Sequence, residues 1–207
     1  MSSGLVLPVI IPFVTAAVVL LGRHRPIFQS IVTIFAAALH LATGLWLLNG
    51  VHKAGITVLE VAGWPAPFGI ALVADHLSAL MVVITGVIYS AVALYSRDDI
   101  PTDYARRGYY TLVNILVGGI SGAFLTGDLF NLYVWFEVML MASFALLVLG
   151  RRRAQFDGGV EYVVLNIVST LLFLTGLGLV YALTGTLNMA HLHLKLKVAS
   201  DPGLVAA

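Results

Sequence analysis

DLFNLYVWFEVMLMASFALLVLG, residues 128–150, is the stretch of sequence that decides the fold. Tyrosine aside, Glu137 is the single ionisable side chain between Asp128 and Gly150. A helix that crosses the hydrocarbon core of a bilayer, about 30 Å thick, needs roughly 20 mostly apolar residues. The run therefore predicts a membrane-spanning helix that carries one carboxyl group near its middle.

Five more apolar stretches of this kind occur along the chain. A bilayer core offers backbone groups no water to bond, so each stretch is expected to be a helix, and none alternates as a barrel strand does. The first has no basic residue before it and a basic segment directly after it, which predicts a retained helix and not a cleaved leader. The sequence thus predicts an all-α integral membrane protein with about six transmembrane helices. The five stretches are Gly4–Gly22, Ile27–Gly50, Gly69–Ser96, Gly108–Thr126 and Val160–Gly185.

The overall composition excludes most other classes of protein. Of the 207 residues, 60% are hydrophobic and 10% are charged, and the mean hydropathy is +1.00. Soluble domains carry about 25% charged residues, so an ordinary soluble enzyme is excluded. A net charge of +1 offers no basic surface to nucleic acid. Cysteine is absent, which excludes disulfide scaffolds, iron–sulfur clusters and thiolate zinc sites.

Arginine and lysine are distributed unevenly between the connections. Counting lysine and arginine alone, the loops after the first, third and fifth stretches hold eight arginines and no lysine. The connections and tail on the opposite side of the membrane hold three lysines and no arginine. Because cytoplasmic loops are enriched in basic residues, the arginine-rich loops are predicted to be cytoplasmic, with both ends of this chain outside. The arginines are Arg23, Arg25, Arg97, Arg106, Arg107, Arg151, Arg152 and Arg153, and the lysines are Lys53, Lys195 and Lys197.

Two segments outside the stretches have patterns of their own. The connection Val51–Phe68 is rich in proline and glycine towards its end, which excludes a helix there. His191–Val198 alternates polar and apolar residues, which predicts a strand-like or surface segment. His191 and His193 have no third ligand at a sensible spacing, so no metal site is expected.

Glu137 is the residue that points most directly to a function. An ionisable group near the bilayer midplane costs on the order of 3 kcal/mol to insert, and such groups usually serve ion or proton movement. Burial favours the neutral acid and a nearby cation favours the carboxylate, so a carboxyl held between these two effects can bind and release a proton. The alternative is a protonated acid that only helps helix packing.

Several other polar residues are weaker candidates. Tyr133 lies one helical turn before Glu137 and has the reach to hydrogen-bond its carboxyl. His40 lies inside its own stretch and is either a proton relay or a packing residue. Asp75 lies at the outer end of the third helix. Asp128 is interpreted as a helix cap, and Glu161 as a cap or salt-bridge partner.

A known family shares several of these segments. The run Thr126–Met139, with supporting stretches at Gly63–Asp75, Glu161–Asn166 and Leu183–Ala190, resembles the fifth helix and neighbouring segments of the D subunit of Mrp-type, multisubunit Na⁺/H⁺ antiporters. The resemblance implies a fold of about fourteen helices with two inverted five-helix repeats. It also implies that Glu137 matches the family's essential glutamate, whose lysine partner lies in a broken seventh helix. None of the six stretches contains a lysine.

The resemblance implies a function and an organisation for the chain. It predicts the N-terminal part of an ion-translocating subunit in a bacterial plasma membrane, a secondary transporter and not an enzyme, with no cofactor. Residues 1–107 would hold helices one to three, and residues 108–207 helices four to six, the start of the proton-antiporter domain. The partners would be other antiporter subunits, H⁺, Na⁺ or another monovalent cation, and lipid. Two alternatives stay open: a proton-pumping subunit of complex I or of a membrane-bound hydrogenase, and a helix scaffold without transport.

Overall fold

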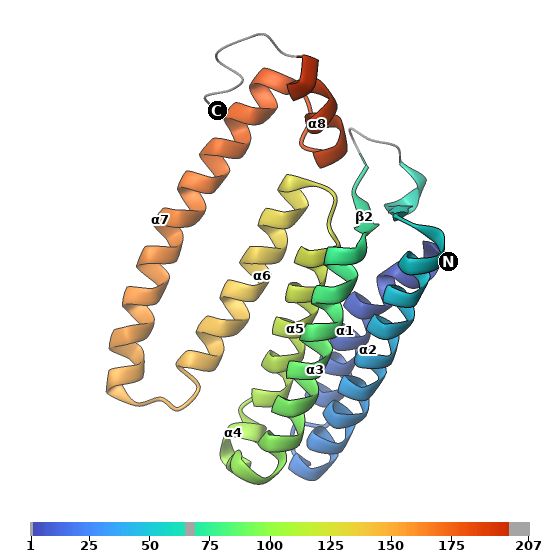
Figure 1. Ribbon diagram of the computed structural model, residues 1–207. Helices are drawn as coiled ribbons and strands as arrows, with labels where there is room; N and C mark the ends of the chain where they lie inside the picture. Colours follow the sequence, from blue (N-terminus) through green and yellow to red (C-terminus); the bar gives the residue numbers. More distant parts are fainter. Residues whose placement is uncertain (1, 65–68, 199–207) are drawn as a thin grey trace.

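Long helices lying side by side make up most of the computed structural model, which describes residues 2–64 and 69–198 (Figure 1). Five helices are long and apolar enough to cross a membrane, and the shorter α5 is apolar too. At 1.5 Å per residue, α5 is about 26 Å long, close to the thickness of the hydrocarbon core. The prediction of an all-α membrane protein with about six spanning helices is therefore confirmed. The spanning helices are α1 (Leu7–Leu21), α2 (Pro26–Ala54), α3 (His76–Asp99), α5 (Tyr109–Leu125), α6 (Leu129–Leu147) and α7 (Arg153–Thr184).

The helix ends follow local sequence signals. Pro26 begins α2, where a missing N–H costs nothing. Asp75 and Asp128 cap α3 and α6 with their side chains, so the interpretation of Asp128 as a cap is confirmed. Gly185 ends α7 in the left-handed region, with φ of 68°, which a side chain would strain.

Four helices, α1, α2, α3 and α5, form a bundle with the main apolar core (Figure 1). The packing is close because small residues lie at the crossings: a Cβ added to Gly86 of α3 would lie 2.9 Å from the Cα of Leu41 in α2. Helix α6 packs on α5, and α7 contacts α6. The largest of the core clusters contains Leu5, Val9, Leu47, Val51, Leu72, Ala74, Ala79, Val82 and Leu125.

The connections contain short elements that the apolar pattern did not predict. A 3-10 turn, η1 (Ser2–Val6), precedes α1, and a five-residue helix, α4 (Thr102–Arg106), precedes α5. Strands β1 (Thr57–Glu60) and β2 (Ala71–Ala74) pair antiparallel, with the 3-10 turn η2 (Val61–Gly63) after β1. The predicted helical start of the stretch Gly69–Ser96 is therefore wrong, because residues 71–74 pair with β1 and α3 begins only at His76, after the Asp75 cap. The predicted absence of helix at the end of the 51–68 connection holds for an α-helix up to residue 64, although residues 61–63 form the short 3-10 turn η2, and residues 65–68 lie outside the described residues.

The strand-like prediction for His191–Val198 is wrong, because the segment lies in the helix α8 (Met189–Val198). The side chain of Asn188 accepts a hydrogen bond from the His191 N–H and so starts a helix. Leu192 is buried while Leu194 and Leu196 are exposed, so the alternating leucines do not form one face. The sixth helix also begins earlier than expected, at Arg153 and not Val160, which places Glu161 inside α7 and not at its start.

Backbone hydrogen bonds join three segments at the end of the molecule opposite the arginine-rich loops. The Leu129 N–H donates to the Leu187 carbonyl, and the Met189 N–H donates to the Gly127 carbonyl, both at 2.9 Å. Asp128 and Asn188 thereby form an antiparallel bridge. The Gly127 N–H also donates to the Ala71 carbonyl at 2.8 Å. The start of α6 is thus fixed both to β2 and to the segment between α7 and α8.

Candidate functional site

Glu137 lies half-buried in the middle of α6, on the side that meets α7. The hydroxyl of Thr170 in α7 donates a hydrogen bond to Glu137 Oε1 at 2.8 Å. Among the described residues, Thr170 is the one hydrogen-bonding partner of this carboxyl. A carboxyl placed between two helices and bonded by a single hydroxyl keeps its second oxygen for other chemistry.

Tyr133 is close to Glu137 in α6 but takes part in aromatic packing. Its ring stacks on Phe173 of α7, with centroids 6.2 Å apart and planes at 24°, and contacts Phe130 at 5.9 Å. Phe136 also meets Phe173, at 6.5 Å. Within the described chain no hydrogen bond joins Tyr133 to Glu137. The structure thus gives Glu137 a different partner, Thr170, which no local sequence signal indicates because it lies on another helix.

His40 lies away from α6 and α7, in the bundle of α1, α2, α3 and α5, where it sits between α2 and α5. It is fully buried, its Nε2 lies 2.9 Å from the Ser121 hydroxyl, and its ring meets Tyr89 edge-on with centroids 6.0 Å apart. Its Nδ1 has no hydrogen-bonding partner among the described residues. The structure therefore does not bring His40 together with Glu137.

The same bundle contains a second buried polar group around Asn114 of α5. The Tyr89 hydroxyl donates to Asn114 Oδ1, while Asn114 Nδ2 donates to Thr33 Oγ1 at 3.2 Å and to the Tyr110 carbonyl at 2.7 Å. These bonds link α2, α3 and α5 through side chains whose polar atoms are satisfied, as interior helix contacts require. We assign this group to the packing of the bundle.

Asp75 forms a capping box at the start of α3. Its Oδ1 accepts from the Ser78 N–H at 2.7 Å, and the Ser78 hydroxyl accepts from the Asp75 N–H at 2.9 Å. The Ser78 N–H holds the pKa of the Asp75 carboxyl below its usual value. Asp75 also lines a cavity of about 710 Å³ with Glu60 and His191, but its geometry is that of a helix cap.

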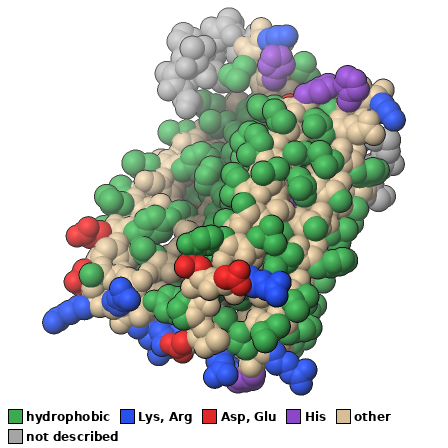
Figure 2. Space-filling model, turned by 60° about the horizontal axis from the view of Figure 1, so that its bottom comes forward, with side chains coloured by type: hydrophobic (Ala, Val, Ile, Leu, Met, Phe, Trp, Pro, Cys, Tyr) green, Lys and Arg blue, Asp and Glu red, His purple; other side chains and the backbone are tan. Residues whose placement is uncertain are grey.

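Charged side chains gather at the end of the molecule made by the α1–α2, α3–α5 and α6–α7 loops, while hydrophobic side chains cover the flanks (Figure 2). Arg107 forms an ion pair with Asp103 and donates to the Leu149 carbonyl at 3.2 Å. At the opposite end, Lys195 of α8 donates to the Thr184 carbonyl at the end of α7. Among the described residues, no group of three metal-ligating side chains is present.

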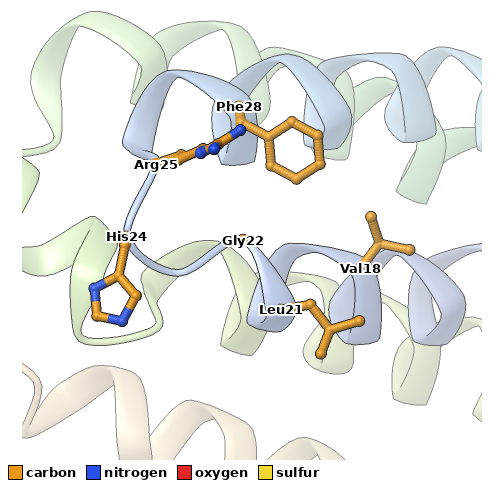
Figure 3. Close-up of a pocket in the computed structure, with 6 residues that line it drawn as sticks. All are labelled: Val18, Leu21, Gly22, His24, Arg25 and Phe28. Carbon is orange, nitrogen blue, oxygen red and sulfur yellow. The ribbon is translucent and has the colours of Figure 1, made fainter.

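A cavity of about 520 Å³ opens at the arginine-rich end between α1 and α2 (Figure 3). Val18 and Leu21 reach it from α1, Phe28 reaches it from α2, and Arg25 lies at its edge in the loop. None of the predicted site residues lines it, so it is separate from the Glu137 site.

Comparison with known proteins finds relatives of this chain. The chain is 40% identical over 205 residues to the D subunit of a Na(+)/H(+) antiporter of Bacillus subtilis, a match that covers 99% of this chain and 42% of the relative. Its structure matches a chain of the "Mrp complex from Dietzia sp. DQ12-45-1b" with a TM-score of 0.88 and 28% identity, covering 100% of this chain and 39% of that chain. The chain is a relative of the D subunits of Mrp-type antiporters.

Further matches extend this relationship to the D subunits of other cation antiporters. The D subunit of a probable K(+)/H(+) antiporter of Rhizobium meliloti is 40% identical over 203 residues, covering 93% of this chain and 36% of the relative. A family model described as "NADH:quinone oxidoreductase/Mrp antiporter, TM" matches residues 126–205. The chain spans about two fifths of the length of the curated relatives it matches, and it corresponds to their N-terminal part. The family resemblance stated from the sequence is confirmed.

Proposed function

We propose that this chain is part of an ion-translocating subunit of a multisubunit cation/proton antiporter, and that Glu137 carries the proton. The observation that supports it is the half-buried carboxyl in the middle of a spanning helix, bonded at one oxygen by Thr170 and, within residues 2–64 and 69–198, at no oxygen by a backbone N–H. Such a group can change protonation state without unfolding a helix end. The cation is Na⁺ or another monovalent ion, since the relatives named above belong to a Na⁺ and a K⁺ antiporter.

The proposal includes partners and an orientation in the membrane. The subunit would assemble with other antiporter subunits in a bacterial plasma membrane, in contact with lipid, and would act as a secondary transporter and not as an enzyme. The arginine-rich end would be cytoplasmic because basic residues concentrate there. We divide the chain into residues 1–107, which hold the first three spanning helices, and residues 108–207, which begin the antiporter domain; the family match at residues 126–205 lies within the second part.

The test is to change Glu137 in the full-length subunit within its complex. Glu137→Gln keeps the size of the side chain but cannot release a proton, so it should abolish cation-dependent proton exchange in membrane vesicles, as should Glu137→Ala. Glu137→Asp withdraws the acid by one methylene and should leave partial exchange. Glu161→Gln is the matched control, since Glu161 is an exposed carboxyl of α7. Normal exchange by Glu137→Gln, at normal subunit abundance, would refute the proton-carrier role.

A second candidate function is a proton-pumping subunit of a redox-driven complex, because the matching family model also covers NADH:quinone oxidoreductases. The same vesicles distinguish the two. An antiporter exchanges protons when only a cation gradient is imposed, whereas a redox pump moves protons only when an electron donor and acceptor are supplied.

A further inference from the structure

Three polar residues of α7 recur at a spacing of four, and the first and last of them contact α6. Tyr162, Asn166 and Thr170, which we name the α7 polar stripe, lie on one side of the helix because residues four apart are neighbours on its surface. Each is half-buried, whereas many apolar side chains of α7, such as Leu165 and Leu172, are strongly exposed. The stripe is therefore a set of half-buried polar side chains on a helix whose exposed surface is largely apolar.

The stripe contacts α6 at both of its ends. Tyr162 Oη lies 2.8 Å from the Ser143 hydroxyl of α6, and Thr170 donates to Glu137 at 2.8 Å. Between them, Asn166 Nδ2 donates to the Tyr162 carbonyl at 2.7 Å. Since α6 ends and α7 begins at the arginine-rich end, the Tyr162–Ser143 contact lies between that end and Glu137 (Figure 1).

The interface on the other side of Glu137 has the opposite character. Phe173, beyond Thr170 in α7, packs against Tyr133 and Phe136 of α6 through its ring. Polar groups therefore lie on the side of the arginine-rich end, and aromatic rings lie on the other side. These contacts between α6 and α7 are thus hydrogen bonds from Glu137 toward the arginine-rich end and ring contacts beyond Glu137, where Tyr133 adds a hydroxyl of its own.

The hydroxyl of Thr170 differs from those of its neighbours on α7. Ser169 donates to the Leu165 carbonyl, and Thr175 donates to the Leu171 carbonyl, each four residues back in the same helix. This is the usual arrangement of a hydroxyl within a helix. Thr170 instead donates across the interface to Glu137 Oε1. Its hydroxyl thus fixes one oxygen of the carboxyl and leaves Oε2 without a partner among the described residues.

We propose that the α7 polar stripe is the route by which protons reach Glu137 from the arginine-rich end, and that Thr170 is a positioning residue that presents Oε2 to them. This inference rests on the proposed function of Glu137. Successive stripe residues are about 6 Å apart along the helix, a separation that a bridging water molecule spans. An arriving proton forms an O–H bond at Oε2 and converts the carboxylate to the neutral acid, while Thr170 keeps its bond to Oε1.

The test uses variants of the full-length subunit in the assembled complex, reconstituted in proteoliposomes. Thr170→Val removes the hydroxyl at nearly constant shape and should lower the maximal exchange rate about tenfold or more, as expected for loss of a hydrogen bond to a charged group. The KM for the cation should not change. Thr170→Ser keeps the hydroxyl and should restore most of the rate. Thr175→Val is the matched control, because its hydroxyl bonds only within α7, and its rate should stay normal.

Two further measurements distinguish impaired proton access to Glu137 from impaired folding of the subunit. Asn166→Leu should lower the exchange rate with normal complex assembly. In infrared difference spectra, the carbonyl band of protonated Glu137, identified by its loss in Glu137→Gln, should move to higher frequency in Thr170→Val because its hydrogen bond is lost. If Glu137→Gln is inactive while Thr170→Val and Asn166→Leu exchange normally, the route is wrong and the proposed function stands. If Glu137→Gln is active, the proposed function itself fails.

Discussion

Carboxyl groups occur in two kinds of surroundings in this structure. Asp75 and Asp128 accept hydrogen bonds from backbone N–H groups at helix starts, at 2.7 Å from Ser78 and 2.9 Å from Asn131. Glu137 accepts only from the Thr170 side chain, in the middle of a helix. Backbone N–H groups of a helix start only donate, whereas a hydroxyl can donate to the carboxylate or accept from the neutral acid. At the scale of the residue, Glu137 differs from Asp75 and Asp128 in that it does not hold a helix end.

The cap at Asp75 gives a prediction about stability and pH. Asp75→Ala should destabilise the protein by about 1 kcal/mol, the usual contribution of an N-cap. Because the Ser78 N–H lowers the pKa of the folded carboxyl, the stabilisation should be complete above the ordinary aspartate pKa of about 3.9. It should be lost as the pH falls through the lower folded value.

Thermal unfolding of the purified protein between pH 3 and 7 measures this difference. Asp157→Ala serves as the control, because Asp157 is exposed and caps no helix. A gap between wild type and Asp75→Ala that stays constant down to the lowest pH would contradict the assignment of the cap.

At the scale of the element, close helix contacts depend on glycine. Gly86 of α3 faces the Leu41 backbone of α2, and Gly118, Gly119 and Gly122 of α5 face Phe13, Met139 and Trp135 respectively. One side of α5 therefore packs on α1 and another on α6. The α5 glycines thus serve helix packing, since small residues let membrane helices approach closely.

The crossing of α2 and α3 yields a second stability prediction. Gly86→Ala would place a Cβ 2.9 Å from the Leu41 Cα, so the two helices must move apart, and overpacking of this kind costs about 1–3 kcal/mol. Gly176→Ala in α7 meets no atom within 4 Å and should be neutral or slightly stabilising because alanine favours helices. Melting temperatures of the two variants in detergent provide the comparison; equal values would show that the crossing tolerates a methyl group.

The sequence predicted the spanning helices and the carboxyl near the middle of α6, but not the residue that hydrogen-bonds this carboxyl or the short elements between the helices. Long apolar runs determine α2 and α6 because the bilayer requires every backbone group to be paired within its helix. The helix α8 was missed because Asn188, a cap, overrides the alternating pattern that follows it. Thr170 was missed because its role depends on which face of α7 meets α6, and nothing near it in the sequence specifies that face. The β1–β2 pair escaped prediction because short strands depend on pairing and not on apolar length.

At the scale of the whole molecule, basic residues and buried residues are both unevenly distributed. The arginines cluster at one end, and α7 has only Gly159, Leu177 and Thr184 buried along its described length. The bundle of α1, α2, α3 and α5 therefore holds its own core, while α7 offers most of its surface to its surroundings. An orientation with the arginine-rich end in the cytoplasm satisfies the charge distribution.

Cysteine substitution tests this orientation, since the chain has no cysteine of its own. Single replacements of Arg25, Arg106 and Arg152, all exposed, should resist an impermeant maleimide added outside intact cells and react once the membrane is opened. Lys53→Cys, exposed at the opposite end, should react from outside. Rapid external labelling of all three arginine positions would reverse the assignment.

The backbone bonds between Gly127–Leu129 and Leu187–Met189 have a mechanical consequence for the pair α6 and α7. The short 148–152 loop joins the two helices at the arginine-rich end, and these bonds join them again at the other end. The two helices are thus connected at both ends, and neither can slide along the other without breaking main-chain hydrogen bonds. Sliding of α6 along α7 is therefore not expected to gate Glu137, so a disulfide clamp between the far ends of α6 and α7 should leave ion exchange unimpaired.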